Sequence, residues 1–303
     1  MISHKYRVRL PLMILCMVAL AAAPAVAAAT TSLTVMNVTR DGKTVFSEQT
    51  VSFQWMAQNL PVLGNGVTHY YHQGPVMNAS IPDKWNPQEN DPVILTKDYG
   101  AVKGTDVKDL CNLVGGMDPD DLYVVLEAPD GFSKAFAYSS VYTPQPRTGP
   151  VVITWYRADE GYVNQSYATG MRNVMFADTT NNPWGAHVFG LWDMHEAYPE
   201  GFWYYYQPGL PSTTGLSVQN IDTVKIVSRY PLPLPGQSRA PADPDNDHLY
   251  EDLNGNGFLD FNDLVLLYNH MAWVSGNEPV SLFDFDSSGS LNINDVIRLF
   301  QEL

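Results

Sequence analysis

Cysteine is scarce in this chain, which limits how the fold can be held together. The 303 residues contain two cysteines, Cys16 and Cys111. Cys16 lies in an N-terminal apolar stretch that we expect to be removed, so Cys111 has no partner for an intramolecular disulfide. Because Leu110, Leu113 and Val114 surround it in sequence, we interpret Cys111 as a small buried residue and not as a reactive thiol.

Positive charge is also sparse. The chain has 17 Lys and Arg against 32 Asp and Glu, and three of the basic residues fall within the first nine positions. Residues 243–303 alone contain 12 acidic residues and one arginine, a net charge of −11. This balance argues against nucleic acid or an anionic membrane surface as a partner. It fits either a solvated acidic tail or a cation-binding module.

Long apolar runs are missing after the first 28 residues. Residues 1–28 have the layout of a secretory signal peptide: a basic start, an apolar run over 10–20, and small residues with an A-x-A cleavage site at 25–28. An uncleaved anchor is the alternative, but the run is shorter than the roughly 20 residues that a span requires. We therefore expect a secreted or cell-surface protein with no membrane span after signal cleavage.

The remaining chain divides by composition into three segments. Residues 29–228 have the composition of one globular domain, 229–242 form a Pro-rich linker that we expect to be semi-rigid, and 243–303 form the acidic module. For the first segment we predict an α+β fold. Its expected elements are strands at 33–38, 121–128, 151–156 and 224–228, and a helix at 106–114. For the acidic module we predict a small all-α pair of EF-hand-like units.

Two stretches of the acidic module repeat one pattern. Asp252 begins D-L-N-G-N-G-F-L-D-F-N-D, and Asp284, 284 − 252 = 32 residues later, begins D-F-D-S-S-G-S-L-N-I-N-D. Both copies have glycine at position 6, leucine at position 8 and aspartate at position 12, and an amphipathic helix follows each. Chance spacing in a solvated tail does not explain this double agreement. The repeat therefore indicates a paired metal-binding module.

Calcium is the ion that this pattern favours. It takes six to eight oxygen ligands, and a twelve-residue loop supplies them from positions 1, 3, 5, 7, 9 and 12. Magnesium is a weaker alternative because it requires a stricter octahedral cage. The expected ligands of the two calcium ions are Asp252, Asn254, Asn256, the carbonyl of Phe258, Asp260 and Asp263 in the first loop, and Asp284, Asp286, Ser288, the carbonyl of Ser290, Asn292 and Asp295 in the second.

The two helices behind the loops should share a small core. We expect this core to be built around the two position-8 leucines. Its predicted members are Leu264, Leu267 and Tyr268 on the first helix, Val296, Leu299 and Phe300 on the second, and Leu259 and Leu291 in the loops. Folding of one loop should then assist folding of the other.

Another acidic run precedes the first loop. Asp243, Asp245 and Asp247 alternate as loop ligands do, but His248 stands where the loop needs glycine. The later ligand positions of this run would also overlap the first loop, which begins at Asp252. The spacing alone does not favour a separate ion here.

On these motifs, residues 243–303 resemble the type I dockerins, duplicated loop-helix modules that attach exported proteins to cohesin domains. Aspartate at position 12 and the lack of an evident helix before each loop match that family. The resemblance implies a cohesin-like or other surface protein as partner, chosen in part by positions 10 and 11. These are Phe261, Asn262, Ile293 and Asn294. Dockerins of cellulose-degrading bacteria often carry small hydroxyl residues there, so the alternative is that these residues pack on each other or on the upstream domain.

Residues 93–228 resemble the oxidoreductase molybdopterin-binding, sulfite-oxidase-like fold. The segments that support the resemblance are TDVKDLCNLVGG, DDLYVVLEAPDGFSKAFAYSSV, GMRNVMFADTTNNPWGAHVFG and IDTVKIVS. It implies an α+β domain with mixed sheets. Enzymes of that fold hold molybdenum through a cysteine thiolate in a loop, whereas Cys111 falls in a predicted helix. We therefore expect no molybdopterin.

Catalytic signatures are few in the large domain. It contains no G-x-S-x-G, phosphate-loop or H-E-x-x-H motif. A zinc or copper site in this domain would require its histidines to converge; the alternative is that they are ordinary residues of aromatic-rich loops. A hydrolase would require two of the domain's acidic residues to form a pair. The candidates are His69, His72, His187 and His195, and the acids Asp159, Glu160, Asp193 and Glu196. The aromatic residues of 201–209 suit either sugar stacking or core packing.

These observations favour an exported, non-catalytic modular protein with a calcium-folded docking module. Two enzymes are the alternatives: a polysaccharide-active hydrolase carried by a dockerin, and a redox protein on a molybdopterin-type fold.

Overall fold

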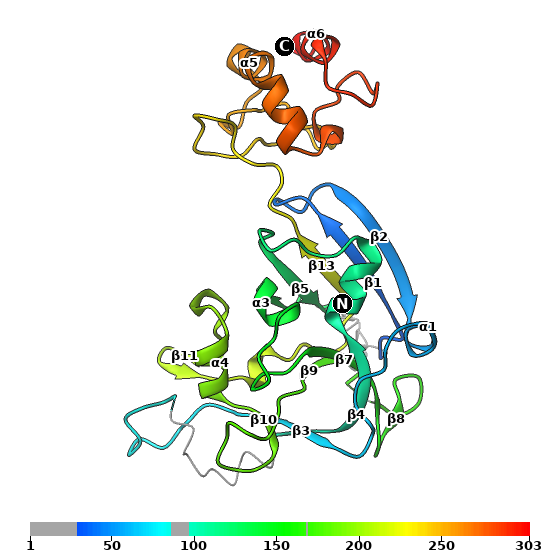
Figure 1. Ribbon diagram of the computed structural model, residues 1–303, viewed down its shortest axis with the longest axis vertical. Helices are drawn as coiled ribbons and strands as arrows, with labels where there is room; N and C mark the ends of the chain where they lie inside the picture. The colour runs from blue at the N-terminus through cyan, green and yellow to red at the C-terminus, as the bar shows by residue number, and fades with distance from the viewer. Residues whose placement is uncertain (1–28, 86–96, 168) are drawn as a thin grey trace, which may run out of the picture.

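The computed structural model describes residues 29–85, 97–167 and 169–303 (Figure 1). The expected signal peptide, residues 1–28, lies outside this described part. Within it, no helix is both long and apolar enough to cross a membrane. The described chain mixes helices with several sheets, so the predicted α+β class is confirmed.

The first sheet joins the beginning and the end of the large domain. Its five strands lie in the order β2-β1-β13-β5-β6. Their bounds are β1 Ser32–Val38, β2 Val45–Ser52, β5 Tyr123–Glu127, β6 Ser133–Phe136 and β13 Thr223–Val227. β1 and β13 pair in parallel, with Val35 opposite Val224, and the other pairs are antiparallel. Because β1 and β13 run side by side in the same direction, the chain leaves the domain next to the β1–β2 turn.

The second sheet has six strands in the order β10-β3-β4-β7-β8, with β9 also paired to β7. Their bounds are β3 His69–His72, β4 Asp98–Asp106, β7 Val151–Arg157, β8 Gly161–Tyr162, β9 Arg172–Met175 and β10 His187–Phe189. A separate two-stranded ribbon contains β11 Tyr205–Gln207 and β12 Leu210–Pro211. The strands predicted at 33–38, 121–128, 151–156 and 224–228 are thus present, within about two residues at each end.

Short helices complete the large domain. They are α1 Phe53–Asn59, α2 Val107–Cys111, α3 Tyr138–Val141, α4 Leu191–Ala197 and the 3-10 turns η2 Asn112–Val114, η3 Glu200–Phe202 and η4 Thr214–Leu216. The predicted helix at 106–114 is α2 followed by η2. Its N-cap is Asp106, whose carboxylate accepts from the Lys108 backbone N–H at 2.9 Å. Leu110 of α2 belongs to the same buried cluster as Val124 of the first sheet and Ile153 of the second.

The C-terminal module has its own core. It contains α5 Phe261–Asn277, η5 Val280–Leu282 and α6 Ile293–Phe300, and it lies at the end of the first sheet near β1, β2 and β13 (Figure 1). Its buried cluster includes Tyr250, Leu267, Phe283 and Leu299. Leu234, in the segment predicted to be a linker, is 1% exposed within the same cluster. Prolines prevent a helix there, but the intervening leucine still buries its side chain, so this segment packs into the module and is not a free spacer.

For two residues, the prediction that they belong to the core between α5 and α6 is wrong. Leu267, Val296 and Leu299 are buried, but Tyr268 is 59% exposed and Phe300 is 58% exposed. Each of these aromatics follows an inward-facing leucine, and one residue along a helix turns the side chain by about 100°. Leu259, Leu264 and Leu291 are half-buried against the core. Residues outside the helices take the missing places; these are Tyr250, Leu282, Phe283 and Phe285.

The β1–β2 turn contacts the module directly. The Tyr250 hydroxyl oxygen lies 2.8 Å from Asp41 Oδ1 and 2.9 Å from Thr39 Oγ1. The backbone N–H of Arg40 donates to the carbonyl of Tyr230 at 2.7 Å. The module is therefore joined to the large domain by side-chain and backbone hydrogen bonds as well as by the chain itself.

Candidate metal centre

The first loop closes around its two end aspartates. Asp252 is fully buried, and its two carboxylate oxygens accept from the backbone N–H groups of Asn256 at 3.0 Å and Gly257 at 2.6 Å. Asp263, also buried, accepts from the N–H groups of Asn254 at 3.2 Å and Asp260 at 2.8 Å. These bonds tie the carboxylates at positions 1 and 12 to the backbone of the loop between them.

The second loop repeats these bonds at equivalent positions. Asp284 accepts from the N–H groups of Ser288 at 2.9 Å and Gly289 at 2.7 Å. Asp295 accepts from the N–H groups of Asp286 at 3.1 Å and Asn292 at 2.7 Å. All four contacts correspond to those of the first loop after a shift of 32 residues. The sequence repeat is therefore also a structural repeat.

The position-6 glycines and the position-9 residues explain why the loops turn where they do. Gly257 has φ of 96° and Gly289 has φ of 82°, in the left-handed region that glycine enters without a steric cost. Asp260 caps α5 by accepting from the Asn262 N–H, and Asn292 caps α6 in the same way. Each predicted position-9 ligand thus also begins the helix behind its loop.

The three carboxylates of the second loop fit a hard divalent cation, whereas Asp252, Asp260 and Asp263 of the first loop do not form such a group among the described residues. Asp284, Asp286 and Asp295 each have a carboxylate oxygen within 4.8 Å of the others. Two oxygens on opposite sides of one calcium ion are about 4.6–5.2 Å apart, so these oxygens can share one coordination sphere. Burial, together with repulsion from Asp252, raises the pKa of Asp263. A cation in the loop would relieve that penalty.

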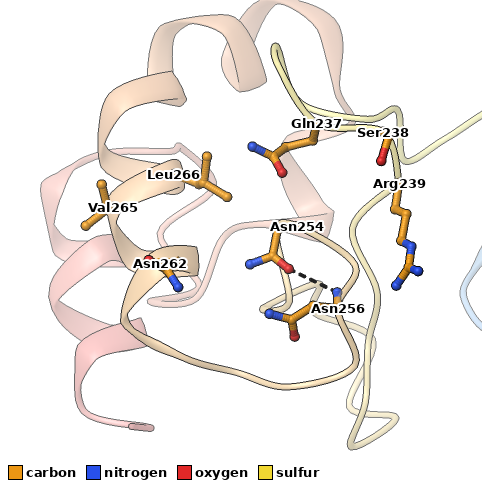
Figure 2. A pocket seen from close by; sticks show the side chains of 8 residues that line it. All are labelled: Gln237, Ser238, Arg239, Asn254, Asn256, Asn262, Val265 and Leu266. Carbon is orange, nitrogen blue, oxygen red and sulfur yellow. Dashed lines mark hydrogen bonds between the residues drawn. The ribbon is translucent and has the colours of Figure 1, made fainter.

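A groove of about 590 Å³ lies beside the first loop (Figure 2). Its lining residues are Gln237, Ser238, Arg239, Asn254, Asn256, Asn262, Val265 and Leu266. Arg239 donates from its guanidinium to the carbonyl of Gly255 at 3.3 Å, which holds the 237–239 segment against the loop. The tips of both loops are exposed, at residues 256–258 in the first and 287–290 in the second.

Each module helix also exposes a stripe of large apolar side chains. Within a helix, members spaced by four and then three residues lie on one face. We call these six residues the apolar stripes: Phe261 at 62% exposed, Val265 at 41% and Tyr268 at 59% on α5, and Ile293 at 47%, Ile297 at 50% and Phe300 at 58% on α6. Each residue of one stripe is 32 positions from its counterpart in the other. Because Phe261 and Ile293 are exposed, the alternative that position 10 packs on its twin or on the upstream domain is wrong.

The four candidate histidines do not gather at one point. His72 is fully buried, accepts from the Met175 N–H at 3.3 Å, and burial lowers its pKa to about 3. His69 pairs with Asp98 on the surface at 2.7 Å. His187 contacts the carbonyl of Ala177 through Nδ1 at 2.7 Å. Within the described residues, no group of three possible metal-ligating side chains includes a histidine.

His195 belongs to an aromatic cluster. Its ring stacks between Trp192 and Trp203 with both centroids 4.9 Å away, and Trp85 lies 5.0 Å away at a steep angle. Its Nδ1 is 2.9 Å from a carboxylate oxygen of Glu196. Trp203, one of the residues considered for sugar stacking, therefore has aromatic neighbours within the protein.

The acids considered for hydrolysis each have a local partner. Asp159 and Glu160 both contact Arg157, at 2.9 and 2.8 Å. Asp193 is buried beside Arg147 at 3.1 Å, and burial raises its pKa to about 6. The structure thus places two of these acids after β7 and the other two, Asp193 and Glu196, in α4.

Cys111 is fully buried at the end of α2, as the sequence predicted. Burial raises the pKa of its thiol, and the nearby charge of Asp106 adds to this effect. A neutral, enclosed thiol does not fit the exposed thiolate that a molybdenum ligand requires.

One acidic residue of the module was missed by sequence reasoning. Glu251 lies with Asp243, Asp245 and Asp247 in a group whose carboxylate oxygens are all within 4.8 Å of one another. Counted from Asp243 in the loop numbering, Glu251 falls at position 9, which is a ligand position. The sequence signal for Glu251 was therefore this count of loop positions, continued past position 6 even though that position is not glycine.

Comparison of the chain with protein-family models, with curated proteins and with solved structures gave no match.

Proposed function

We propose that residues 243–303 form a calcium-folded docking module that attaches this exported protein to a partner protein. The observation that supports docking is the pair of apolar stripes, which are exposed and equivalent in sequence. Each stripe lies on the helix that directly follows one of the loops. An ion bound in that loop would therefore fix the orientation of the stripe. The large domain is, in this proposal, the non-catalytic body that the module carries.

Calcium binding by the loops rests on the chemistry of the donors. The first loop offers three carboxylates, Asp252, Asp260 and Asp263, together with amide and carbonyl oxygens. The second offers Asp284, Asp286 and Asp295, at positions 1, 3 and 12, with one carboxylate oxygen of each within 4.8 Å of the others. Two unit charges 4 Å apart repel by about 1 kcal/mol in water and about 4 kcal/mol near a protein surface. Two calcium ions would turn this repulsion into attraction.

The apolar stripes support a protein as the partner. Burial of one large apolar side chain contributes about 1.5–3 kcal/mol. Two aromatic or β-branched residues at the start and end of each stripe could act as anchors in an apolar pocket, as hot-spot residues do. The resemblance to dockerins implies that this partner is a cohesin-like domain on a surface or scaffold protein. The hydrolase and redox alternatives stay predictions.

Site-directed photo-crosslinking tests the proposal. A photoreactive residue is placed at Val265 or Ile297 in the full-length protein and irradiated in the extracellular fraction of producing cells. We expect one discrete protein adduct from both positions, lost when calcium is chelated. Val67, 76% exposed on the large domain, is the matched control and should give no such adduct. Absence of an adduct from both helix positions, or an adduct equal with and without calcium, would refute docking through these stripes.

A further inference from the structure

Four carboxylates converge just before the first loop. Asp243, Asp245, Asp247 and Glu251 each place an oxygen within 4.8 Å of the other three. Asp245 and Asp247 are exposed, whereas Asp243 is fully buried and Glu251 is 5% exposed. Two of the four carboxylates are therefore removed from solvent. All four lie close enough together to share one coordination sphere.

Glu251 is the residue that local folding does not explain. Its Oε2 is buried and has no hydrogen-bond partner within the described part of the chain. The aspartates, by comparison, accept from the backbone of their own turn, as Asp243 does from the Asn246 N–H at 2.7 Å and the His248 N–H at 3.1 Å. An ionised carboxylate whose buried oxygen has no partner costs several kcal/mol, and either proton uptake or a nearby cation removes that cost.

Among the described residues, none of the four acids forms a salt bridge. Lys43 is adjacent, but its ammonium donates to the backbone carbonyl of Asp243. Four carboxylates at this spacing repel each other by about 1–4 kcal/mol per pair at 4 Å, depending on how much water screens them. A bound cation is the simple way to hold them together.

We propose that Asp243, Asp245, Asp247 and Glu251 form a third divalent-cation site, separate from the two repeated loops. The four ligands occupy positions 1, 3, 5 and 9 of a loop frame and offer only hard carboxylate oxygens, the type that calcium prefers. The site replaces the usual position-12 acid by the buried glutamate at position 9. It therefore ends one residue before Asp252, where the first repeated loop begins.

The third site lies where the module meets the large domain. Asp243 accepts from Lys43 of the β1–β2 turn through its backbone, and Tyr250, beside Glu251, contacts Asp41 of the same turn at 2.8 Å. An ion that joins Asp243 to Glu251 closes this segment against the turn. The third ion would thus stabilise the joint, whereas the two loop ions stabilise α5 and α6.

Native mass spectrometry of the full-length protein without its signal, equilibrated with calcium, counts the ions. We expect three in the wild type and two in Glu251→Gln, which keeps the shape and removes the charge. Asp245→Asn changes an exposed residue and keeps the acceptor for the Asp247 N–H, so it should also bind two. Glu278→Gln is the matched control, because Glu278 Oε2 is likewise buried without a partner but lies outside the cluster; it should keep three.

The outcomes separate this site from the proposed docking module. Two ions in the wild type, with one in Asp286→Asn, would overturn the third site and leave both loops intact. Three ions in both Glu251→Gln and Asp245→Asn would overturn the assignment of the ligands. No bound calcium in the wild type would refute the calcium-folded module itself. Circular dichroism of each variant in calcium confirms that a lost ion does not reflect a lost fold.

Discussion

The large domain and the C-terminal module differ in the size of their apolar cores and in their density of acidic residues. The large domain buries residues from two sheets and α2 in one apolar cluster. The module buries a smaller cluster and places 12 acidic residues in 61 positions. A domain of about 60 residues without disulfides has a marginal core and generally needs a metal or a similar constraint. The comparison shows a large apolar core in one part of the chain and a smaller core with a high density of acids in the other, which is where our proposal places cation binding.

The two regions also differ in the groups that contact their buried carboxylates. In the large domain the buried Asp193 is paired with Arg147, and the buried Asp106 accepts from the Lys108 backbone N–H. In the module, Asp252, Asp263 and Asp295 are buried with backbone N–H groups as their hydrogen-bond donors. N–H donors stabilise a carboxylate but leave its net charge in place. The module thus keeps a charge that a cation can neutralise.

Chelation of calcium should give the largest effect and test the comparison most directly. Each occupied site contributes about 2.7 kcal/mol when calcium is at 100 times its dissociation constant, which is a large part of a small domain's stability. We expect hydrogen exchange to show loss of protection in α5 and α6 on chelation, with β4 and β7 unchanged. Equal protection of α5 with and without calcium would show that burial alone folds the module.

Removal of one position-12 aspartate should be nearly as damaging. Asp263→Ala or Asp295→Ala loses a ligand and the capping box of α5 or α6, at a combined cost of about 3–5 kcal/mol. Because Leu267 and Leu299 share one core, each variant should weaken the calcium-induced helical signal of both halves in circular dichroism. Glu48→Ala, at an exposed acid of β2, is the control. A loss of helical signal equal to that of one helix alone would show that the two halves of the module fold independently.

Glu278 allows a test through pH. Burial raises its pKa to about 7, against 4.5 normally, while its Oε1 accepts from the Leu232 N–H at 2.9 Å. The unfolded chain releases this proton first as pH rises, so stability falls between about pH 4.5 and 7. Glu278→Gln keeps the acceptor and removes the titration. We expect it to match the wild type at pH 4.5 and to exceed it by about 2–3 kcal/mol above pH 7.

Urea unfolding in saturating calcium measures this difference. The difference in free energy of unfolding between variant and wild type is taken at each pH. Titration of the proposed calcium ligands cancels in this difference because both proteins share them. A difference that stays constant from pH 4.5 to 8 would mean that Glu278 is ionised in the folded protein throughout that range.

The smallest expected effect concerns the joint between the two regions. Tyr250→Phe removes the hydroxyl that contacts Asp41 and Thr39 and keeps the buried ring. The loss should be about 0.5–1.5 kcal/mol in the unfolding of the module by urea. Tyr206→Phe, at a residue 55% exposed on the large domain, should leave stability unchanged. Equal effects from the two variants would show that the joint hydrogen bonds do not contribute.

Features that depend on neighbouring residues could be predicted from the sequence. The left-handed glycines Gly257 and Gly289 follow from local turn chemistry, and the structure has them where the repeat placed them. That Asp260 caps α5 was not predicted, although it too depends on local turn chemistry. Strands such as β7 also follow, because a run of β-branched residues is a local signal. The assignment of calcium and of a docking partner stays a prediction from the same repeat.

Features that depend on distant segments required the tertiary structure. Tyr268 and Leu267 are both apolar, and only the packing of Phe283 and Tyr250 decides that Leu267 faces inward. The burial of Leu234 and of Glu251, whose Oε2 has no hydrogen-bond partner among the described residues, likewise depends on surfaces supplied from elsewhere. The sequence by itself determined the twofold loop pattern and the helix starts, because hydrogen bonds within twelve residues set them. The tertiary structure decided which side chains are buried, because burial depends on what the rest of the chain places opposite them.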